Sequence, residues 1–226
     1  MKWIDADGTA VPVTVVRKPV KTARLQVRPD GTIRIVAPRS FPIDAFLARN
    51  TAWITQRRRD LARLAEAGDG NEDRLLLCGE YYRLVEGKPF GVDEEEGTVT
   101  APSLTVLKRN LIAMLRREIA ADAALHPALA ERAPPEVTVR MQQTKWGSCS
   151  SLGNLNFNLR VIALPVSLRE YIVVHELAHL REHNHSRAFW EVVHRHYPDY
   201  RSAEAELRRY WVLLERNRLW KALREA

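Results

Sequence analysis

The chain has 226 residues, of which 46% are hydrophobic and 28% charged, which suits one large globular domain or two small ones. Its two cysteines lie far apart and form no CxxC pair, so the sequence suggests neither a disulfide framework nor a cysteine-rich zinc site. Asp5 and Asp7 interrupt the apolar run that a signal peptide needs. With no stretch of membrane-spanning length, we expect a cytoplasmic protein. A net charge of +7 permits binding to polyanions without establishing it.

The first half of the sequence predicts short strands and one basic helix. Residues 11–36 alternate between apolar and polar side chains around the turn sequence PDG, a pattern typical of a β-hairpin. Residues 46–67 follow a helical period, and residues 75–87 predict a further strand or hairpin. Residues 1–103 are therefore expected to form a β-rich N-terminal part.

The character of the chain changes at Ser103. A long amphipathic helix is predicted from there to about His126. Two or three strands joined by a tight Ser/Gly-rich turn follow over residues 137–165. Residues 104–226 are therefore expected to form a second part, and the whole pattern predicts an α+β fold.

Three helices are predicted after Pro165. Ser167 and Glu170 have the spacing of a capping box, which marks the start of the first. Residues 186–197 predict a second helix, and residues 199–219 predict a last one that Asp199 can cap.

The first of these helices carries the sequence HELAH at residues 175–179. His175 and His179 are four residues apart, so both imidazoles lie on one face of a helix within reach of one metal ion. Glu176 lies beside them, in the position of a general base that takes a proton from the water at the metal. The spacing is that of the HExxH motif of zinc hydrolases.

A third ligand must come from beyond the helix. His183 continues the series, but on a straight helix it would lie roughly 12 Å from His175, too far for both to share an ion at bond lengths near 2 Å. Asn184 tolerates the backbone conformation that ends a helix, so the chain can reverse there and return His185 to the site. We therefore predict that His175, His179 and His185 bind the metal.

Three neutral imidazoles leave one tetrahedral position open, which is typical of catalytic zinc. A purely structural zinc, or histidines without any metal, are the alternatives. Three further histidines, His183, His194 and His196, are interpreted as polar groups of helix surfaces.

Several motifs together resemble one protein family. They are TKWGSCS (144–150), FNLR (157–160), YIVVHELAHL (171–180), NHSRAFW (184–190) and PDY (198–200). In these motifs the chain resembles the YgjP-like metal-dependent hydrolases, relatives of the SprT-like and WLM zinc peptidases. The resemblance implies a zincin-like fold, in which a small sheet packs on the HExxH helix, and it supports His185 as third ligand. The family usually has arginine where this chain has Lys145. The positive charge is kept, but lysine lacks the planar guanidinium that binds a planar anion by two parallel hydrogen bonds.

The strand near TKWGSCS is expected to lie at the edge of the sheet, beside the metal helix. Such a strand offers backbone groups to an extended peptide, so Lys145 and Trp146 are candidate substrate-binding residues. Trp146 as a core anchor is the alternative. Asn158 is a third candidate, which either supports the site by hydrogen bonding or caps a turn.

The leading functional hypothesis is a zinc metallopeptidase with Glu176 as its base. A nucleoside triphosphate pyrophosphatase of the UTP type is the first alternative, and it needs cations such as Arg140, Lys145 and Arg160 near the metal. The second is a DNA-associated, SprT-like module that holds phosphates with the basic helices at 53–64 and 207–221. The sequence predicts no oligomeric state.

Overall fold

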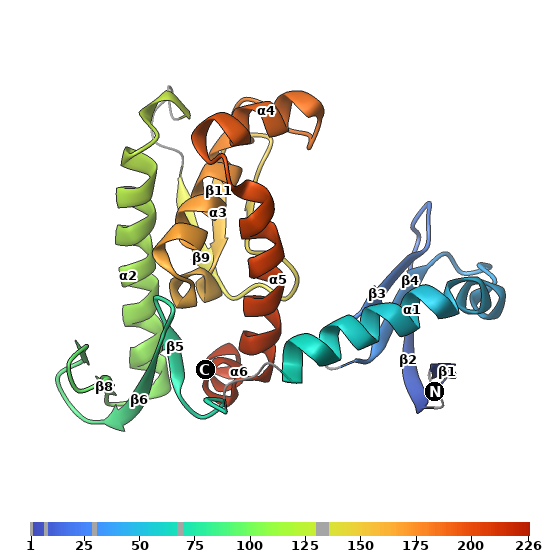
Figure 1. The fold of residues 1–226 in the computed structure, drawn as a ribbon, viewed down its shortest axis with the longest axis horizontal. Helices are drawn as coiled ribbons and strands as arrows, with labels where there is room; N and C mark the ends of the chain where they lie inside the picture. The colour runs from blue at the N-terminus through green and yellow to red at the C-terminus, as the bar shows by residue number, and fades with distance from the viewer. Residues whose placement is uncertain (1, 7–8, 29–30, 67–69, 130–135) are drawn as a thin grey trace. The chain divides into compact units, whose positions relative to one another are not determined.

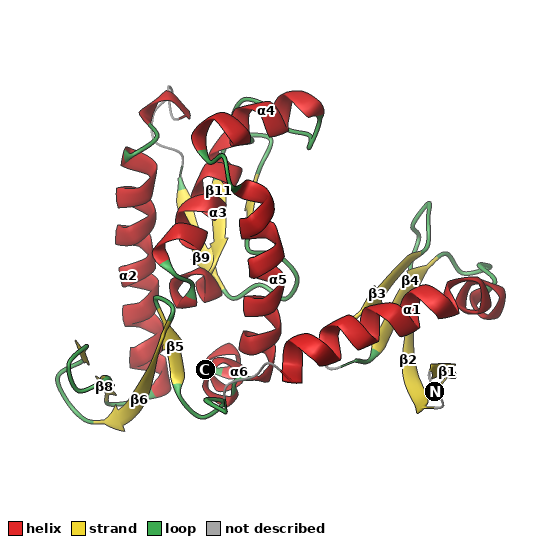
Figure 2. Cartoon of the chain, viewed as in Figure 1, coloured by secondary structure: helices red, strands yellow, loops and turns green. Residues whose placement is uncertain are grey.

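The computed structural model describes residues 2–6, 9–28, 31–66, 70–129 and 136–226. The chain forms two compact units, which we call unit 1 (Met1–Gly70 with Trp211–Arg216) and unit 2 (Asn71–Tyr210 with Asn217–Ala226). Both units combine helices and strands, so the predicted α+β class is confirmed (Figure 2).

Unit 1 contains one mixed sheet with strand order β1-β2-β4-β3. Its strands are β1 (Lys2–Ala6), β2 (Thr9–Arg17), β3 (Arg24–Val27) and β4 (Ile33–Ala37). The antiparallel pair β3–β4 confirms the predicted hairpin. Pro29 and Asp30 of its turn lie outside the described residues, and Gly31 follows them with a φ of +79°, a conformation that favours glycine.

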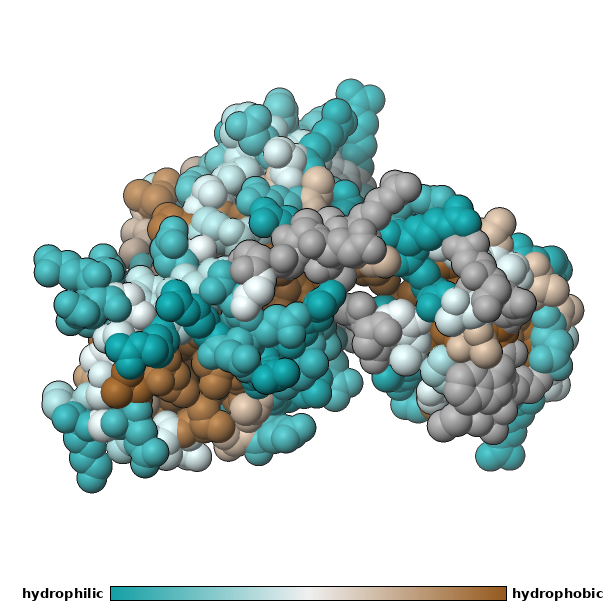
Figure 3. All heavy atoms as spheres, turned by 60° about the horizontal axis from the view of Figure 1, so that its bottom comes forward, coloured by the Kyte–Doolittle hydropathy of each residue, from teal (hydrophilic) through white to brown (hydrophobic). Residues whose placement is uncertain are grey.

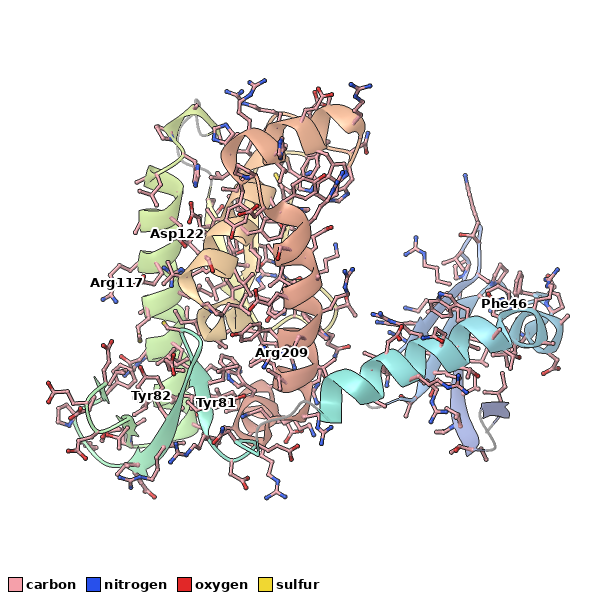
Figure 4. All side chains as sticks on the ribbon, in the orientation of Figure 1. Phe46, Tyr81, Tyr82, Arg117, Asp122 and Arg209 are labelled. Atoms are coloured by element: carbon pink, nitrogen blue, oxygen red, sulfur yellow. The ribbon has the colours of Figure 1, made fainter. Side chains whose placement is uncertain are left out.

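Helix α1 (Ile43–Glu66) packs on this sheet and confirms the predicted basic helix. It buries apolar side chains at helical spacing against the strands, and Phe46 meets Phe41 edge to face at 5.1 Å (Figure 4). Residues 1–70 hold nearly all of the net charge of +7, because basic residues outnumber acidic ones there about two to one. The excess positive charge of the chain therefore lies mainly in unit 1.

Unit 2 begins with a second small sheet of order β5-β6-β8-β7. Its strands are β5 (Leu75–Leu77), β6 (Glu80–Glu86), β7 (Gly91–Asp93) and β8 (Thr98–Ala101), and β5–β6 is the hairpin predicted there. The backbone N–H groups of its turn residues, Cys78 and Gly79, donate to the carbonyls of Ile162 and Ala163 at 2.8 and 2.9 Å. The hairpin thus holds the segment that leads into the helix with the HExxH sequence.

The boundary expected after residue 103 differs from the division of the structure, which falls after Gly70. Residues 71–103 belong to unit 2, because they contact the C-terminal half of the chain. The Trp220 indole is fully buried and donates a hydrogen bond to the Leu76 carbonyl at 3.0 Å, although the two residues are 144 positions apart in the sequence. Composition along the chain does not reveal such a contact.

The centre of unit 2 is a helix pair on a three-stranded sheet of order β10-β11-β9 (Figure 1). Its elements are α2 (Leu104–Ala124), β9 (Val137–Arg140), β10 (Gly147–Cys149), β11 (Leu155–Asn158), the 3-10 helix η2 (Leu159–Ala163) and α3 (Val166–Ala178). A short 3-10 turn, η1 (Pro127–Leu129), follows α2. Ser103 caps α2. As predicted, β10 lies at the sheet edge and contacts α3. A small sheet packed on the HExxH helix is the zincin-like arrangement.

A buried ion pair joins α2 to α3. The Arg169 guanidinium donates to the Asp122 carboxylate at 2.7 Å, with both side chains at most 5% exposed, and Glu118 lies 3.1 Å away at the rim. Figure 4 labels Asp122 on α2. Because a buried charge without its partner is costly, this pair fixes the two helices against each other.

The predicted capping box at the start of α3 is wrong. The helix begins at Val166 after Pro165, without a side-chain cap. Glu170 instead lies 3.0 Å from the ring of His126, at the end of α2. A tertiary contact has taken the side chain that local spacing assigned to the cap.

Three helices complete the chain: α4 (Arg187–His196), α5 (Tyr200–Arg216) and α6 (Arg218–Glu225). The last predicted helix is interrupted at Asn217, whose Oδ1 accepts from the Trp220 N–H and starts α6. Among the described helices, none is long and apolar enough to cross a membrane. The face drawn in Figure 3 is largely hydrophilic, with apolar residues in limited patches.

Candidate metal centre

Three histidines converge at the end of α3. His175 lies in the last turn of the helix, His179 is its C-cap residue, and His185 lies in the connection to α4. One ring nitrogen from each lies within 4.8 Å of the others, and the Nε2 atoms of His175 and His185 are 3.0 Å apart. The structure thus brings together the histidines that the sequence selected, whereas His183 is exposed and outside this group.

The reversal that returns His185 differs in detail from the prediction. Helix α3 ends at Ala178, six residues before Asn184, and Asn184 does not adopt the left-handed conformation. Backbone hydrogen bonds from Leu180 and Arg181 to the last helical turn begin the reversal. Ser186 then starts α4 by accepting a hydrogen bond from the Phe189 N–H.

Hydrogen bonds fix two of the three rings. The His179 Nδ1–H donates to the Glu182 carbonyl at 3.1 Å, so that its Nε2 is left to face the centre. The Tyr171 hydroxyl lies 3.4 Å from His175 Nδ1, which likewise leaves Nε2 of that ring for the centre. Both contacts supply the orientation that metal-binding imidazoles normally receive from a neighbouring polar group.

An aromatic wall covers one side of the cluster. The ring of Phe189, which is fully buried, lies 4.5–5.0 Å from the rings of His175, His179 and His185. Trp190, half-buried, lies about 6 Å from His175 and His185. Phe189 is a core residue, and it shields the histidines from water on this side.

Glu176 lies on the same helix and is only 5% exposed. Among the described residues its Oε2 atom has no hydrogen-bond partner. Burial raises the pKa of this carboxyl to about 8, and the nearby Lys145 ammonium opposes that increase. Across from it lies Gly147 of β10, where a Cβ would come within 2.6 Å of the Glu176 Oε1 atom. The edge strand therefore holds the carboxylate in place and permits no larger residue.

The residues present fit a bound metal ion. Burial, and the neighbouring rings of His179 and His185, lower the pKa of His175 to about 3, so its imidazole is neutral, as a ligand must be. Four-coordinate zinc with bonds of about 2.0–2.1 Å places ligand nitrogens roughly 3.3 Å apart, close to the observed 3.0 Å between His175 and His185. A buried carboxylate with an unsatisfied oxygen beside three such nitrogens suits a hydrated cation.

The three candidate substrate-binding residues lie in different environments. Lys145 is exposed near Glu176, and Trp146 is half-buried at the start of the edge strand. Asn158 is fully buried and bonds the backbone of Gln142, Lys145 and Arg160. Asn158 therefore caps the turn of the loop before β10. Because it is buried, it can influence substrate binding only by holding that loop in position.

The cations that a pyrophosphatase would need do not gather at the cluster. Arg140 lies on β9, at the sheet edge opposite β10. Arg160 has no exposed surface, so it is not offered to a ligand. Of the three predicted cations, Lys145 alone acts on the pKa of Glu176.

Sequence reasoning missed Tyr171, the Glu182 carbonyl and the packing of Gly147 on Glu176. Tyr171 lies four residues before His175, so helical spacing alone would have placed it beside that ring. The other two contacts depend on how the chain turns after α3 and on how β10 pairs, for which the sequence carries no local signal.

Comparison with known proteins agrees with this site. The family model of the YgjP-like metallopeptidase domain matches residues 21–210, and the chain therefore belongs to the YgjP-like family. Family membership makes it a metal-dependent hydrolase of the metallopeptidase class. The metallopeptidase zymogen of Pyrococcus abyssi abylysin is 23% identical to this chain; the match covers 41% of this chain and 90% of that one, at a TM-score of 0.36. No curated protein matches the sequence.

Proposed function

We propose that this protein is a zinc-dependent metallopeptidase in which His175, His179 and His185 bind zinc and Glu176 is the general base. The observation that carries the proposal is the convergence of three imidazole nitrogens within 4.8 Å beside a buried carboxylate whose Oε2 is unsatisfied. Imidazole donors without thiolate or carboxylate ligands suit zinc. When bound, zinc supplies Lewis acidity, which polarises a carbonyl group and lowers the pKa of water.

The residues of the chain supply the rest of the chemistry. Glu176 accepts a proton from the attacking water and passes it to the leaving amine. Gly147 lets the edge strand lie against this carboxylate and restrains its position. Phe189 excludes water from one side of the histidines, which strengthens electrostatic interactions at the site.

The edge strand is the proposed binding surface for the substrate. Strand β10 pairs with β11 on one side and is the last strand of its sheet. An extended peptide can add to its free side by backbone hydrogen bonds, which places a scissile carbonyl near Glu176. Lys145 and Trp146 directly precede this strand and are the proposed contacts for substrate.

A single assay tests the proposal. The zinc-loaded protein is incubated with an unfolded protein and a pool of nucleoside triphosphates, and products are identified by mass spectrometry. Peptide products that vanish in Glu176→Gln but persist in Glu206→Gln, an exposed residue on α5, are expected. Nucleotide products that depend on Glu176 would replace the peptidase by the pyrophosphatase alternative.

The DNA-associated alternative has one observation in its favour, the concentration of positive charge in unit 1. It predicts binding to duplex DNA that weakens steeply with salt and persists when zinc is removed. Substituting Arg24 and Arg34, which share one face of the unit 1 sheet, would then reduce the salt dependence. Indifference to DNA at low salt removes this alternative.

A further inference from the structure

A pocket of about 350 Å³ lies beside the metal centre, between α4 and the start of α5. Its lining consists of Arg187, Trp190, Glu191, His194, Pro198, Tyr200 and Arg201. The α4 members are spaced at helical periods and form one face of that helix. Phe189 and Val193, on another face of α4, are fully buried.

Trp190 connects this pocket to the metal centre. Its ring lies 5.8 Å from that of His185 on one side and stacks on Tyr200 at 5.0 Å on the other. The Arg201 guanidinium lies over the Tyr200 ring at 5.6 Å. A continuous series of flat groups therefore runs from the candidate zinc ligand His185 to a cation, and Trp190 is shared by the pocket and the metal centre.

The charges of the pocket favour an anion. The lining carries two arginines and one carboxylate, and Glu191 is occupied by Arg187 at 2.7 Å. The side chains of Arg187 and Glu191 are 95% and 60% exposed, so their ion pair contributes little to stability and Arg187 can bind another carboxylate instead. Arg201 bonds only the Tyr200 hydroxyl and forms no ion pair within the described part of the chain. Its guanidinium can therefore bind a carboxylate of a ligand.

The size of the pocket suits a segment of chain rather than a folded partner. A volume of about 350 Å³ lies at the lower end of small-ligand sites, which run from roughly 300 to 1,000 Å³. An aromatic floor with a guanidinium at its end accommodates an aliphatic stem that ends in a carboxylate.

We propose that this pocket binds an acidic side chain of the peptide substrate, close to the scissile bond on the side of His185. The proposal rests on the proposed peptidase function and adds a substrate preference to it. Arg201 and Arg187 bind the carboxylate, and Trp190 with Tyr200 packs against the aliphatic stem.

A peptide library tests the preference. The zinc-loaded protein is incubated with a library of unstructured peptides, and the residues around each cleaved bond are identified by mass spectrometry. Glutamate and aspartate are expected to be enriched about tenfold at one position near the cleaved bond, the factor that one charge-assisted hydrogen bond supplies. The double variant R187Q/R201Q is expected to lose the enrichment. R195Q, which removes an exposed arginine of α4 outside the pocket, is expected to keep it.

A binding measurement separates the two proposals. Fluorescent decapeptide pools with one fixed glutamate or one fixed glutamine are titrated onto the zinc-loaded protein at the physiological ionic strength of about 0.15 M. If the glutamate pool binds more tightly and R187Q/R201Q abolishes that difference, the pocket is supported even when no peptide is cleaved. The absence of cleavage would refute only the peptidase. Cleavage without acidic enrichment, or an enrichment that R195Q reduces as much as R187Q/R201Q does, overturns the pocket and leaves the peptidase standing.

Discussion

Replacing Gly147 by alanine tests whether the edge strand positions the proposed base. The added Cβ would lie 2.6 Å from Oε1 and 2.8 Å from Cγ of Glu176. Non-bonded carbon atoms pack at roughly 3.5–4.0 Å, so the carboxylate or the strand must move by about 1 Å. The backbone at this glycine is not in the left-handed region, so the effect comes from space and not from conformation.

The expected result is a large loss of activity with the metal retained. A displacement of about 1 Å at a reacting group costs on the order of 100-fold in rate, and we expect that loss in kcat/KM for peptide hydrolysis by Gly147→Ala. Overpacking costs about 1–3 kcal/mol of stability, which the folded protein tolerates. Zinc affinity should change little, because Gly147 contacts Glu176 and not the histidines.

The assay compares kcat/KM, zinc affinity and the free energy of unfolding in three proteins. Gly91→Ala is the matched control, because its added Cβ meets no heavy atom within 4 Å and its φ is ordinary. Activity of Gly147→Ala within about twofold of the wild type would refute the positioning role of the strand. A loss of zinc affinity as large as the loss of activity would also refute it.

Three further substitutions test the ligands and the framework. His185→Ala should weaken zinc affinity by more than the roughly 10–100-fold typical of residues that only orient a ligand, whereas His183→Ala should leave it nearly unchanged in a chelator competition; equal effects would refute the assignment. Asn158→Ala should lower the free energy of unfolding by about 2–4 kcal/mol in urea, because it abandons buried backbone partners, and a loss below 1 kcal/mol would contradict this. Arg169→Met should cost about 3–5 kcal/mol by leaving Asp122 buried without its partner, and the double variant with Asp122→Leu should recover part of that loss.

The sequence predicted the histidine cluster because helix geometry is fixed. A rise of 1.5 Å per residue permits His175 and His179 to share an ion and excludes His183, whatever the rest of the fold does. That reasoning required a reversal before His185, and the structure has one. The position where α3 ends was not predictable, because the bonds that end it involve backbone groups from Leu177 to Glu182 and not the Asn184 side chain.

The helix starts show the limit of local signals. The hydroxyl groups of Ser103 and Ser186 cap α2 and α4, where the sequence predicted that helices begin. At α3 the same type of signal failed, since Glu170 bonds His126, which lies 44 residues earlier in the sequence. Capping spacing is therefore a reliable guide only where the side chain has no tertiary partner of its own.

The contacts that position the candidate base are the ones that local sequence reasoning cannot reach. Glu176 is predicted to be the base from its place between two histidines, yet its orientation depends on Gly147, 29 residues earlier on another element. The loop before Gly147 is in turn held by Asn158, from the neighbouring strand. Motif residues thus identify the chemistry, whereas the small and buried residues around them decide whether the reacting atoms meet, and Gly147→Ala separates these two contributions.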